Sequence, residues 1–407
     1  MDIGQFTAGS PGQLVPIELH RSVRKPSGLT EIEPFASQAF SPDVLPPALD
    51  WRSLAADLLP RVSLAQEALG RVNGLTTVVH NARALLRSLW LREAKFSSAI
   101  EDVHTTALDM ALVATQAERP ESNRAVEAWN AVNAIEHGLA SDLPFSVRLI
   151  KEMHVELLRG VRGEDKRPGE LRTIPVYIGP QDRPDRARFV PPPPGNAPGH
   201  LVPLLADLER FVNQTPEEVF PLAAVAIAHY QFETIHPFRD GNGRIGRALV
   251  IHDLCRRGLL DQHVVFLSGY FERNKQMYYD RLLGVSARGD WADWIAFFLD
   301  AIVDQAGETA RLAEKLFRLR ERYIDTVRTK NLSARLLTLI DALFHWPVVT
   351  ARGVAETTGV TDPTARKDIG VLVDHGILKL TSEVSYGQTW YAVDIIRLIE
   401  GDADQDL

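Results

Sequence analysis

The sequence predicts a mainly helical fold, and three observations support that prediction. Of its 407 residues, 45% are hydrophobic and 24% are charged, which is an ordinary globular balance. Most hydrophobic runs are rich in Leu and Ala and follow the spacing of an amphipathic helix, as Leu85, Leu86, Leu89 and Trp90 do. Strand-like runs are short and few. A chain of this length is expected to hold one to three domains.

Charge and cysteine content exclude several classes of protein. The formal net charge of −8 argues against a protein that binds nucleic acid over its whole surface, although it allows a local basic patch. A single cysteine, Cys255, excludes an internal disulfide framework. The first residues lack the basic start and apolar core of a secretory signal, and no hydrophobic run approaches a membrane span in length. We therefore expect a cytoplasmic protein without a membrane partner.

The amino-terminal part is expected to be an arm followed by helices. Residues 1–45 are rich in Pro, Gly and Ser and show no clean period, which is typical of an irregular leader. Helical patterns run from residue 50 to about 115 and from about 123 to 160. We group residues 1–115 as the arm with its helical region, and residues 116–310 as the core of the protein.

Residues 163–199 differ from their surroundings because they contain many Gly and Pro. Two β-prone runs, 173–179 and 187–190, flank the turn-rich sequence GPQDRPD. The pattern predicts an irregular hairpin on a helical body, and a plain surface loop is the alternative.

The carboxyl-terminal part changes character after a linker helix at 311–330. Residues 331–407 predict a helix, a helix–turn–helix and a short pair of strands, which is the layout of a winged-helix domain. Its basic residues, such as Arg366 and Lys367, are offset by acidic ones such as Asp368. DNA affinity depends on neutralising phosphates, and this segment is only weakly basic. It could therefore bind DNA or dock a protein, and both alternatives stay open.

The segment 234–247 carries the chemistry. A helix is expected to stop at the His236–Pro237 pair, because a residue before proline avoids the helical region, and a second helix begins near Arg244. A glycine turn at the start of a helix offers backbone N–H groups that form a cradle for phosphates. His236 can act as a general base. Asp240 is a candidate ligand for Mg²⁺, which binds few carboxylates together with phosphate oxygens.

Two arginines complete this predicted site. Arg244 and Arg247 are three residues apart, share roughly one helix face and can reach the same anion. Such a set of groups suits attack on a phosphoryl group, where positioning and charge neutralisation carry catalysis. A glycine-rich connector with solvent-facing arginines is the structural alternative.

Two other ligand sites can be weighed against this one. Residues 241–246 match GxGxxG, but a dinucleotide-binding fold needs a strand before that motif, and here a helix precedes it. The spacing of the nearby histidines is not that of a transition-metal site; they are His229, His236 and His252.

At every fixed position, the segment from His236 to Arg247 resembles the Fic-family signature, HPFx(D/E)GNGRxxR. The resemblance extends over about residues 45–310. Residues 168–172 and 177–179 resemble the flap hairpin of the family, and residues 274–279 resemble a stretch near the nucleotide base. It implies a Fic helical core with a β-hairpin flap that aligns the target peptide, and the winged-helix tail matches a common architecture of the family.

The resemblance also implies a role for each residue of the motif. His236 would deprotonate the target hydroxyl, and Asp240 would hold Mg²⁺. Arg244 and Arg247 would bind the β- and γ-phosphates of ATP. Phe238 would be a packing anchor. The other nucleotide-binding residues that it implies are Gly241, Asn242, Gly243, Ile245, Gly246 and Tyr278, with Tyr278 near the adenine.

Many Fic proteins carry an inhibitory helix with the pattern (S/T)xxxE(G/N). Here Ser97 and Glu101 fit it and lie on one helix face, while Asp102 departs from the usual Gly or Asn. Glu101 would pair with Arg247 by a charge-assisted bond and keep it from the γ-phosphate. Without the resemblance, these acids would be ordinary surface residues.

The resemblance implies a protein adenylyltransferase that moves AMP from ATP to a Tyr, Thr or Ser hydroxyl of a target protein or of itself, in a homodimer. Doc-type relatives, which transfer a phosphate, carry a lysine where Gly243 stands, so this glycine favours nucleotidyl transfer. Transfer of UMP or phosphocholine and removal of AMP stay open. A DNA-binding regulator of toxin–antitoxin type, with the core as a nucleotide sensor, is the alternative from another class.

Overall fold

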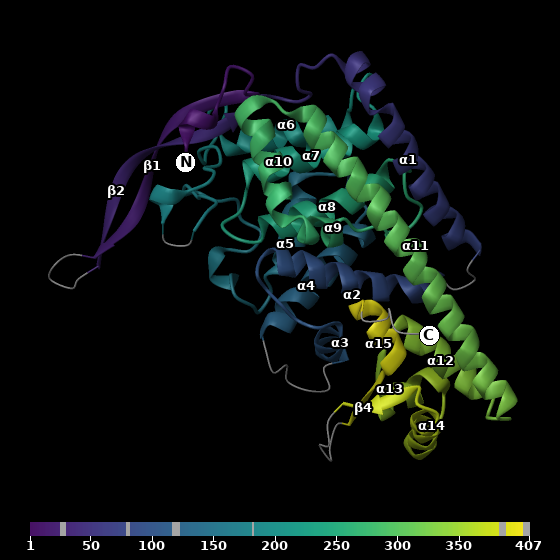
Figure 1. The fold of residues 1–407 in the computed structure, drawn as a ribbon. Helices are drawn as coiled ribbons and strands as arrows, with labels where there is room; N and C mark the ends of the chain where they lie inside the picture. Colours follow the sequence, from purple (N-terminus) through teal and green to yellow (C-terminus); the bar gives the residue numbers. More distant parts are fainter. Residues whose placement is uncertain (25–29, 79–81, 116–122, 181–182, 382–387, 402–407) are drawn as a thin grey trace. The chain divides into compact units, whose positions relative to one another are not determined.

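A computed structural model describes the chain except for residues 25–29, 79–81, 116–122, 181–182, 382–387 and 402–407. It confirms the mainly helical fold (Figure 1). The chain forms two compact units. One comprises Met1–Gln66, Ala134–Leu259 and Arg273–Ala301, and the other comprises Glu67–Asn133, Leu260–Glu272 and Ile302–Leu407. Helices that contribute to both units are α1 (Trp51–Val78), α4 (Asn123–Ala140), α9 (Ser268–Arg273) and α11 (Trp291–Thr329).

The first unit is built around α7 (Pro221–Ile235), which is buried along nearly its whole length. Its sequence is apolar on all sides, as expected for a helix that is covered all round. Three helices pack against it, namely α6 (Leu201–Asn213), α8 (Asn242–Arg256) and α10 (Lys275–Arg288). Helix α5 (Val147–Leu157) in turn packs against α6 and α8. Short connections hold α7 and α8 side by side, so the loop between them is fixed at both ends.

The amino terminus corrects the expectation of an irregular leader. Strand β1 (Gly12–Arg24) pairs antiparallel with β2 (Thr30–Pro42) in one long ribbon (Figure 1). Leu19 is buried on one face of the ribbon and belongs to a cluster with Ala187 and Val190. The period of two that predicts a strand was present in β1, where the apolar residues alternate; they are Val15, Ile17 and Leu19.

The hairpin predicted after residue 163 is reduced to one bridge. Ile178 and Phe189 pair antiparallel outside any named strand. The N–H of Ile178 donates to the carbonyl of Phe189 at 2.8 Å, and the N–H of Arg188 donates back to Ile178 at 2.7 Å. Because the neighbouring cluster includes Ala187 and Val190, the amino-terminal ribbon buries one side of this flap region.

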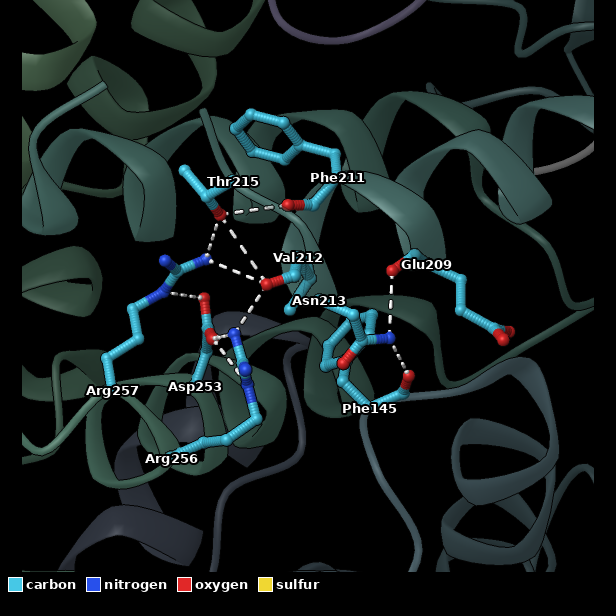
Figure 2. Close-up of polar contacts among 9 residues, drawn as sticks. All are labelled: Phe145, Glu209, Phe211, Val212, Asn213, Thr215, Asp253, Arg256 and Arg257. Atoms are coloured by element: carbon cyan, nitrogen blue, oxygen red, sulfur yellow. Dashed lines mark hydrogen bonds and ion pairs between the residues drawn. The ribbon is translucent and has the colours of Figure 1, made fainter. Parts of the chain in front are cut away.

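The far end of α8 is joined to the end of α6 by a buried ion cluster (Figure 2). Asp253 is 2% exposed and accepts from Arg256 and Arg257 at 3.0 Å each. Arg256 also donates to the carbonyl of Val212, and Arg257 donates to the hydroxyl of Thr215 at 3.0 Å. Arginines here satisfy carbonyl groups that the end of a helix leaves without partners. This cluster anchors the carboxyl end of α8, which is the end opposite the loop that precedes the helix.

In the second unit, α2 (Ala82–Ile100) packs against α12 (Arg335–His345) and α15 (Val393–Glu400). The other elements are α3 (Ala107–Thr115), β3 (Val348–Thr350), α13 (Ala351–Thr358), α14 (Asp362–Asp374), β4 (Leu378–Leu380) and β5 (Thr389–Ala392). The three strands form an antiparallel sheet in the order β3-β5-β4. The order of elements from α12 to β5 agrees with the predicted helix, helix–turn–helix and strand pair, and β3 and α15 are additions. The predicted linker helix is the continuous end of α11.

Candidate active site

The predicted helix stop at His236 is confirmed. Helix α7 ends at Ile235, and His236 follows with a left-handed φ of 51°, its N–H donating to Phe232 at 2.9 Å. The half-buried imidazole places Nδ1 3.2 Å from the carbonyl oxygen of Glu233. Because a carbonyl only accepts, Nδ1 carries the proton and Nε2 holds the lone pair. This is the tautomer that a general base requires.

The backbone that carries His236 is held by Arg172, to which sequence reasoning assigned no function. Arg172 is 3% exposed, and its guanidinium donates to the carbonyls of His236 at 2.8 Å and Pro192 at 2.6 Å. Its own N–H donates to Pro237 at 2.9 Å. Burial lowers the pKa of this guanidinium to about 10, so it stays charged. Arg172 therefore joins the flap region to the strained end of α7.

A second support comes from His154 on α5. Its ring stacks on Phe238 with centroids 3.7 Å apart and planes 5° apart. Nδ1 accepts the N–H of Gly169 at 2.9 Å, so Nε2 carries the proton and donates to the carbonyl of Asp240 at 2.9 Å. Burial lowers the pKa of His154 to about 4, which keeps the ring neutral. A histidine within an amphipathic helix gives no sequence signal for this role.

The turn itself is closed by Asn242. Its Oδ1 accepts from the N–H of Phe238 at 2.8 Å, and its Nδ2 donates to the carbonyl of the same residue at 3.0 Å. Phe238 is fully buried, as its predicted anchoring role requires. Gly241 has a φ of 77°, and a Cβ there would lie 2.9 Å from the side chain of Leu157. The amide of Asn242 thus shapes the turn, and its contact with a phosphate stays a prediction.

The two arginines of the motif are buried, which excludes the alternative of a connector with solvent-facing arginines. Arg244 and Arg247 are each 3% exposed, in the first two turns of α8. Asp240 is about one-third exposed; its Oδ1 accepts the N–H of Gly241 at 2.7 Å and lies 3.8 Å from Nη2 of Arg244. A buried cation at a helix N-terminus makes the start of α8 electropositive.

One partly exposed carboxylate beside such a cradle fits Mg²⁺ that arrives with a triphosphate, because this ion binds few protein ligands and several phosphate oxygens. Within the described residues, no three or more His, Cys, Asp or Glu side chains lie close enough together to hold a metal ion.

Three further residues predicted to bind the nucleotide lie in packed surroundings. Ile245 is fully buried, and a Cβ on Gly246 would lie 2.1 Å from the Glu233 carboxylate, so both let α8 pack closely on α7. Tyr278 is 1% exposed, with its hydroxyl 2.9 Å from Nε2 of His229. Burial lowers the pKa of His229 to about 3. A contact between Tyr278 and adenine stays a prediction. Gly243 is half-buried in the first turn of α8.

The predicted inhibitory residues lie in the second unit. Ser97 is buried in the last turn of α2, and Glu101 is half-buried directly after that helix. Asp102 has a left-handed φ of 59°. Glycine and asparagine favour that conformation, which explains physically why the family pattern has them there.

Comparison with known proteins assigns the fold and site to a class. Residues 144–254 match the Fic/DOC family, and residues 59–140 match the Fic/DOC family N-terminal region. A crystal structure of a Fic family protein from Desulfovibrio desulfuricans G20 covers 82% of this chain and 95% of its own, with a TM-score of 0.52 and 22% identity. Residues 144–254 therefore form a Fic/DOC family domain, preceded by the N-terminal region of that family.

Curated relatives are named protein adenylyltransferase Fic. The protein from Drosophila ananassae is 26% identical over 266 residues, which are 62% of this chain and 49% of the relative. The protein from Drosophila grimshawi is 26% identical over 236 residues, 55% of this chain and 44% of the relative. The chain therefore spans about half the length of the curated relatives it matches. Among the described helices, none is both long and apolar enough to cross a membrane.

Proposed function

We propose that the protein is an adenylyltransferase that moves AMP from ATP to a Tyr, Thr or Ser hydroxyl of a target protein or of itself. The observation that carries this proposal is the 3.2 Å contact between Nδ1 of His236 and the carbonyl oxygen of Glu233. The imidazole donates through Nδ1–H to that carbonyl, which makes Nε2 the basic nitrogen, and the ring belongs to the loop that leads into the start of α8. A ligand sensor would not need an imidazole held in this way.

In the reaction, Nε2 of His236 takes the proton of the target hydroxyl. The hydroxyl oxygen forms a bond to the α-phosphorus, the bond to the bridging oxygen breaks, and pyrophosphate leaves. Arg244 and Arg247 bind the β- and γ-phosphates and orient the α-phosphate for in-line attack. Asp240 would hold the Mg²⁺ that accompanies ATP, and the ion would supply neutralisation of phosphate charge.

The glycine turn supplies the remaining contacts of the nucleotide. The N–H groups of Asn242 and Gly243 lie at the N-terminus of α8, where backbone donors have no partner within the helix, and the N–H of Gly241 donates to Asp240 beside them. The adenine lies near Tyr278. The flap around Ile178 aligns an extended target segment by main-chain hydrogen bonds.

Glu101 restrains this activity by pairing with Arg247, so that ATP binds in an unproductive pose. The pattern from Ser97 to Asp102 supports this, because Asp102 takes the left-handed conformation for which the family uses Gly or Asn. The Glu101→Gly variant should therefore be the active form of the protein.

The charge of the carboxyl-terminal segment favours protein docking over DNA binding. Arg335 pairs with the buried Asp368 at 2.6 Å, and the exposed Arg352 pairs with Glu356 at 2.8 Å. These arginines already have acidic partners, so they offer less to a phosphate backbone. We also propose that this segment is a winged-helix domain and that the protein is a homodimer. A salt-dependent mobility shift of duplex DNA with this segment would argue against protein docking.

The function is tested by intact mass after incubation with ATP and Mg²⁺. The Glu101→Gly variant should gain the mass of AMP, and Glu101→Gly/His236→Ala should label at least about a hundredfold more slowly, the usual contribution of a general base. If Glu101→Gly labels neither itself nor any protein of a lysate with α-labelled ATP, the proposal is wrong. The same assay with UTP or CDP-choline in place of ATP decides which group is transferred. A test for release of AMP from the labelled product shows whether the reverse reaction occurs.

A further inference from the structure

The turn that carries Glu101 is held between two well-defined helix ends. Helix α2 closes with a Schellman motif, in which the N–H of Val103 donates to Ser98 and that of Asp102 donates to Ala99, both at 3.0 Å. Helix α3 opens after Thr106, whose hydroxyl accepts the N–H of Asp109 at 3.0 Å. The position of Glu101 therefore depends on how α2 and α3 are held relative to each other.

A single carboxylate from the end of the chain bridges these two helices. Glu400, the last residue of α15, accepts from Nζ of Lys95 on α2 through Oε2 and from the N–H of Ala107, the first residue of α3, through Oε1. Its backbone carbonyl also lies 3.3 Å from Nζ of Lys95. Figure 1 shows α15 beside α2 and α3, and all three pack against one another.

Burial and charge make this bridge strong. The side chain of Glu400 is only 15% exposed and that of Lys95 is 24% exposed, so solvent screens the pair little. The other oxygen of Glu400 lies at the N-terminus of α3, where a negative charge is favoured by the helix dipole. The two carboxylate oxygens thus bind one donor on each side of the Glu101 turn.

The carboxyl-terminal elements support α2 at further points. Helix α12 packs along α2, and β3 packs against α3. The rings of Trp129 on α4 and Trp346 after α12 meet edge to face, with centroids 5.4 Å apart. The segment after residue 331 therefore packs against the helices on both sides of the turn with Glu101.

We propose that Glu400 is a positioning residue for Glu101, and that the carboxyl-terminal segment thereby controls the restraint on the enzyme. The inference rests on the proposed function, because it needs Glu101 to act as the inhibitory residue. Any partner that displaces α15 from α2 and α3 loosens the turn, withdraws Glu101 and raises the rate of AMP transfer.

The test compares rates of self-labelling with ATP in the full-length protein. Glu400→Gln should raise the rate slightly, because the amide can still accept from Ala107 but loses the ion pair with Lys95. Glu400→Ala should raise it about threefold to tenfold, the range expected for the net loss of one typical hydrogen bond. Asp394→Asn is the matched control: this residue also lies on α15 but pairs with Arg322 at 2.7 Å, so the rate should not change.

A double variant separates positioning from a general loss of stability. In the Glu101→Gly background, Glu400→Ala should add nothing to the rate, because the residue it positions is gone. Amide hydrogen exchange should also quicken over residues 101–109 in Glu400→Ala but not in Asp394→Asn.

Three results would overturn the inference. These are a rate for Glu400→Ala equal to that of the wild type while Glu101→Gly is activated, an equal gain in both backgrounds, or unchanged exchange over residues 101–109. Failure of the proposed function is recognised separately, since Glu101→Gly itself would then transfer no AMP.

Discussion

Two helices of this protein end in the same unusual way but are held by different means. Helix α7 ends just before His236, and α2 ends shortly before Asp102. Both residues have left-handed backbone conformations that non-glycine residues rarely adopt. Distant segments hold the loop after α7: Arg172 donates to the carbonyl of His236, and His154 donates to the carbonyl of Asp240. At Asp102, neighbouring backbone groups of the Schellman motif hold the helix end. The loop with His236 therefore depends on the tertiary fold, whereas the turn that we propose to be inhibitory begins with a locally encoded helix end.

The largest effect should follow from breaking the support of α7. Arg172→Met removes donors from the buried carbonyls of His236 and Pro192, and should lower the free energy of unfolding by roughly 3 kcal/mol. Urea unfolding measures this change, and AMP transfer in the Glu101→Gly background should fall as well. Arg183→Met is a matched control, because its pair with Asp185 is exposed and should contribute less than about 0.5 kcal/mol. Equal losses in the two variants would show that the α7 end is not held from a distance.

An intermediate effect should appear on acidification. Burial lowers the pKa of His154 to about 4 and that of His229 to about 3, below their ordinary value of 6.5. The unfolded chain takes up these protons first, so stability is present above pH 6.5 and is lost as pH falls toward 4. Between pH 6.5 and pH 5 each residue should cost roughly 2 kcal/mol. His154→Phe keeps the stack on Phe238 and should reduce this pH dependence; an unchanged dependence in urea unfolding would contradict the assignment.

The smallest effect should come from the local end of α2. Asp102→Gly relieves a left-handed residue and should raise the free energy of unfolding by roughly 0.5–1 kcal/mol, whereas Asp102→Ala should not. Thermal unfolding of both variants measures the difference. Because the turn would become better defined, self-labelling should stay as low as in the wild type. A destabilised Asp102→Gly would mean that the carboxylate, and not the backbone, fixes this helix end.

Some elements were predictable because their signals lie within a few residues. The stop of α7 at the His236–Pro237 pair and the tight turn at Gly241 follow from backbone preferences that neighbouring residues impose. The start of α8 is at Asn242, two residues earlier than expected, since helix ends shift easily by that amount. The amino-terminal ribbon was missed because Pro16 and Pro34 interrupt the strand pattern that the alternating residues carry.

The sequence by itself determined the order of helices and the composition of the Fic motif, because those depend on spacing along the chain. Only the tertiary structure decided that Arg172 and His154 hold the motif, that Arg244 and Arg247 are buried, and that Glu400 bridges α2 and α3. Such contacts join residues far apart in sequence, and their energies depend on burial, which no local pattern specifies.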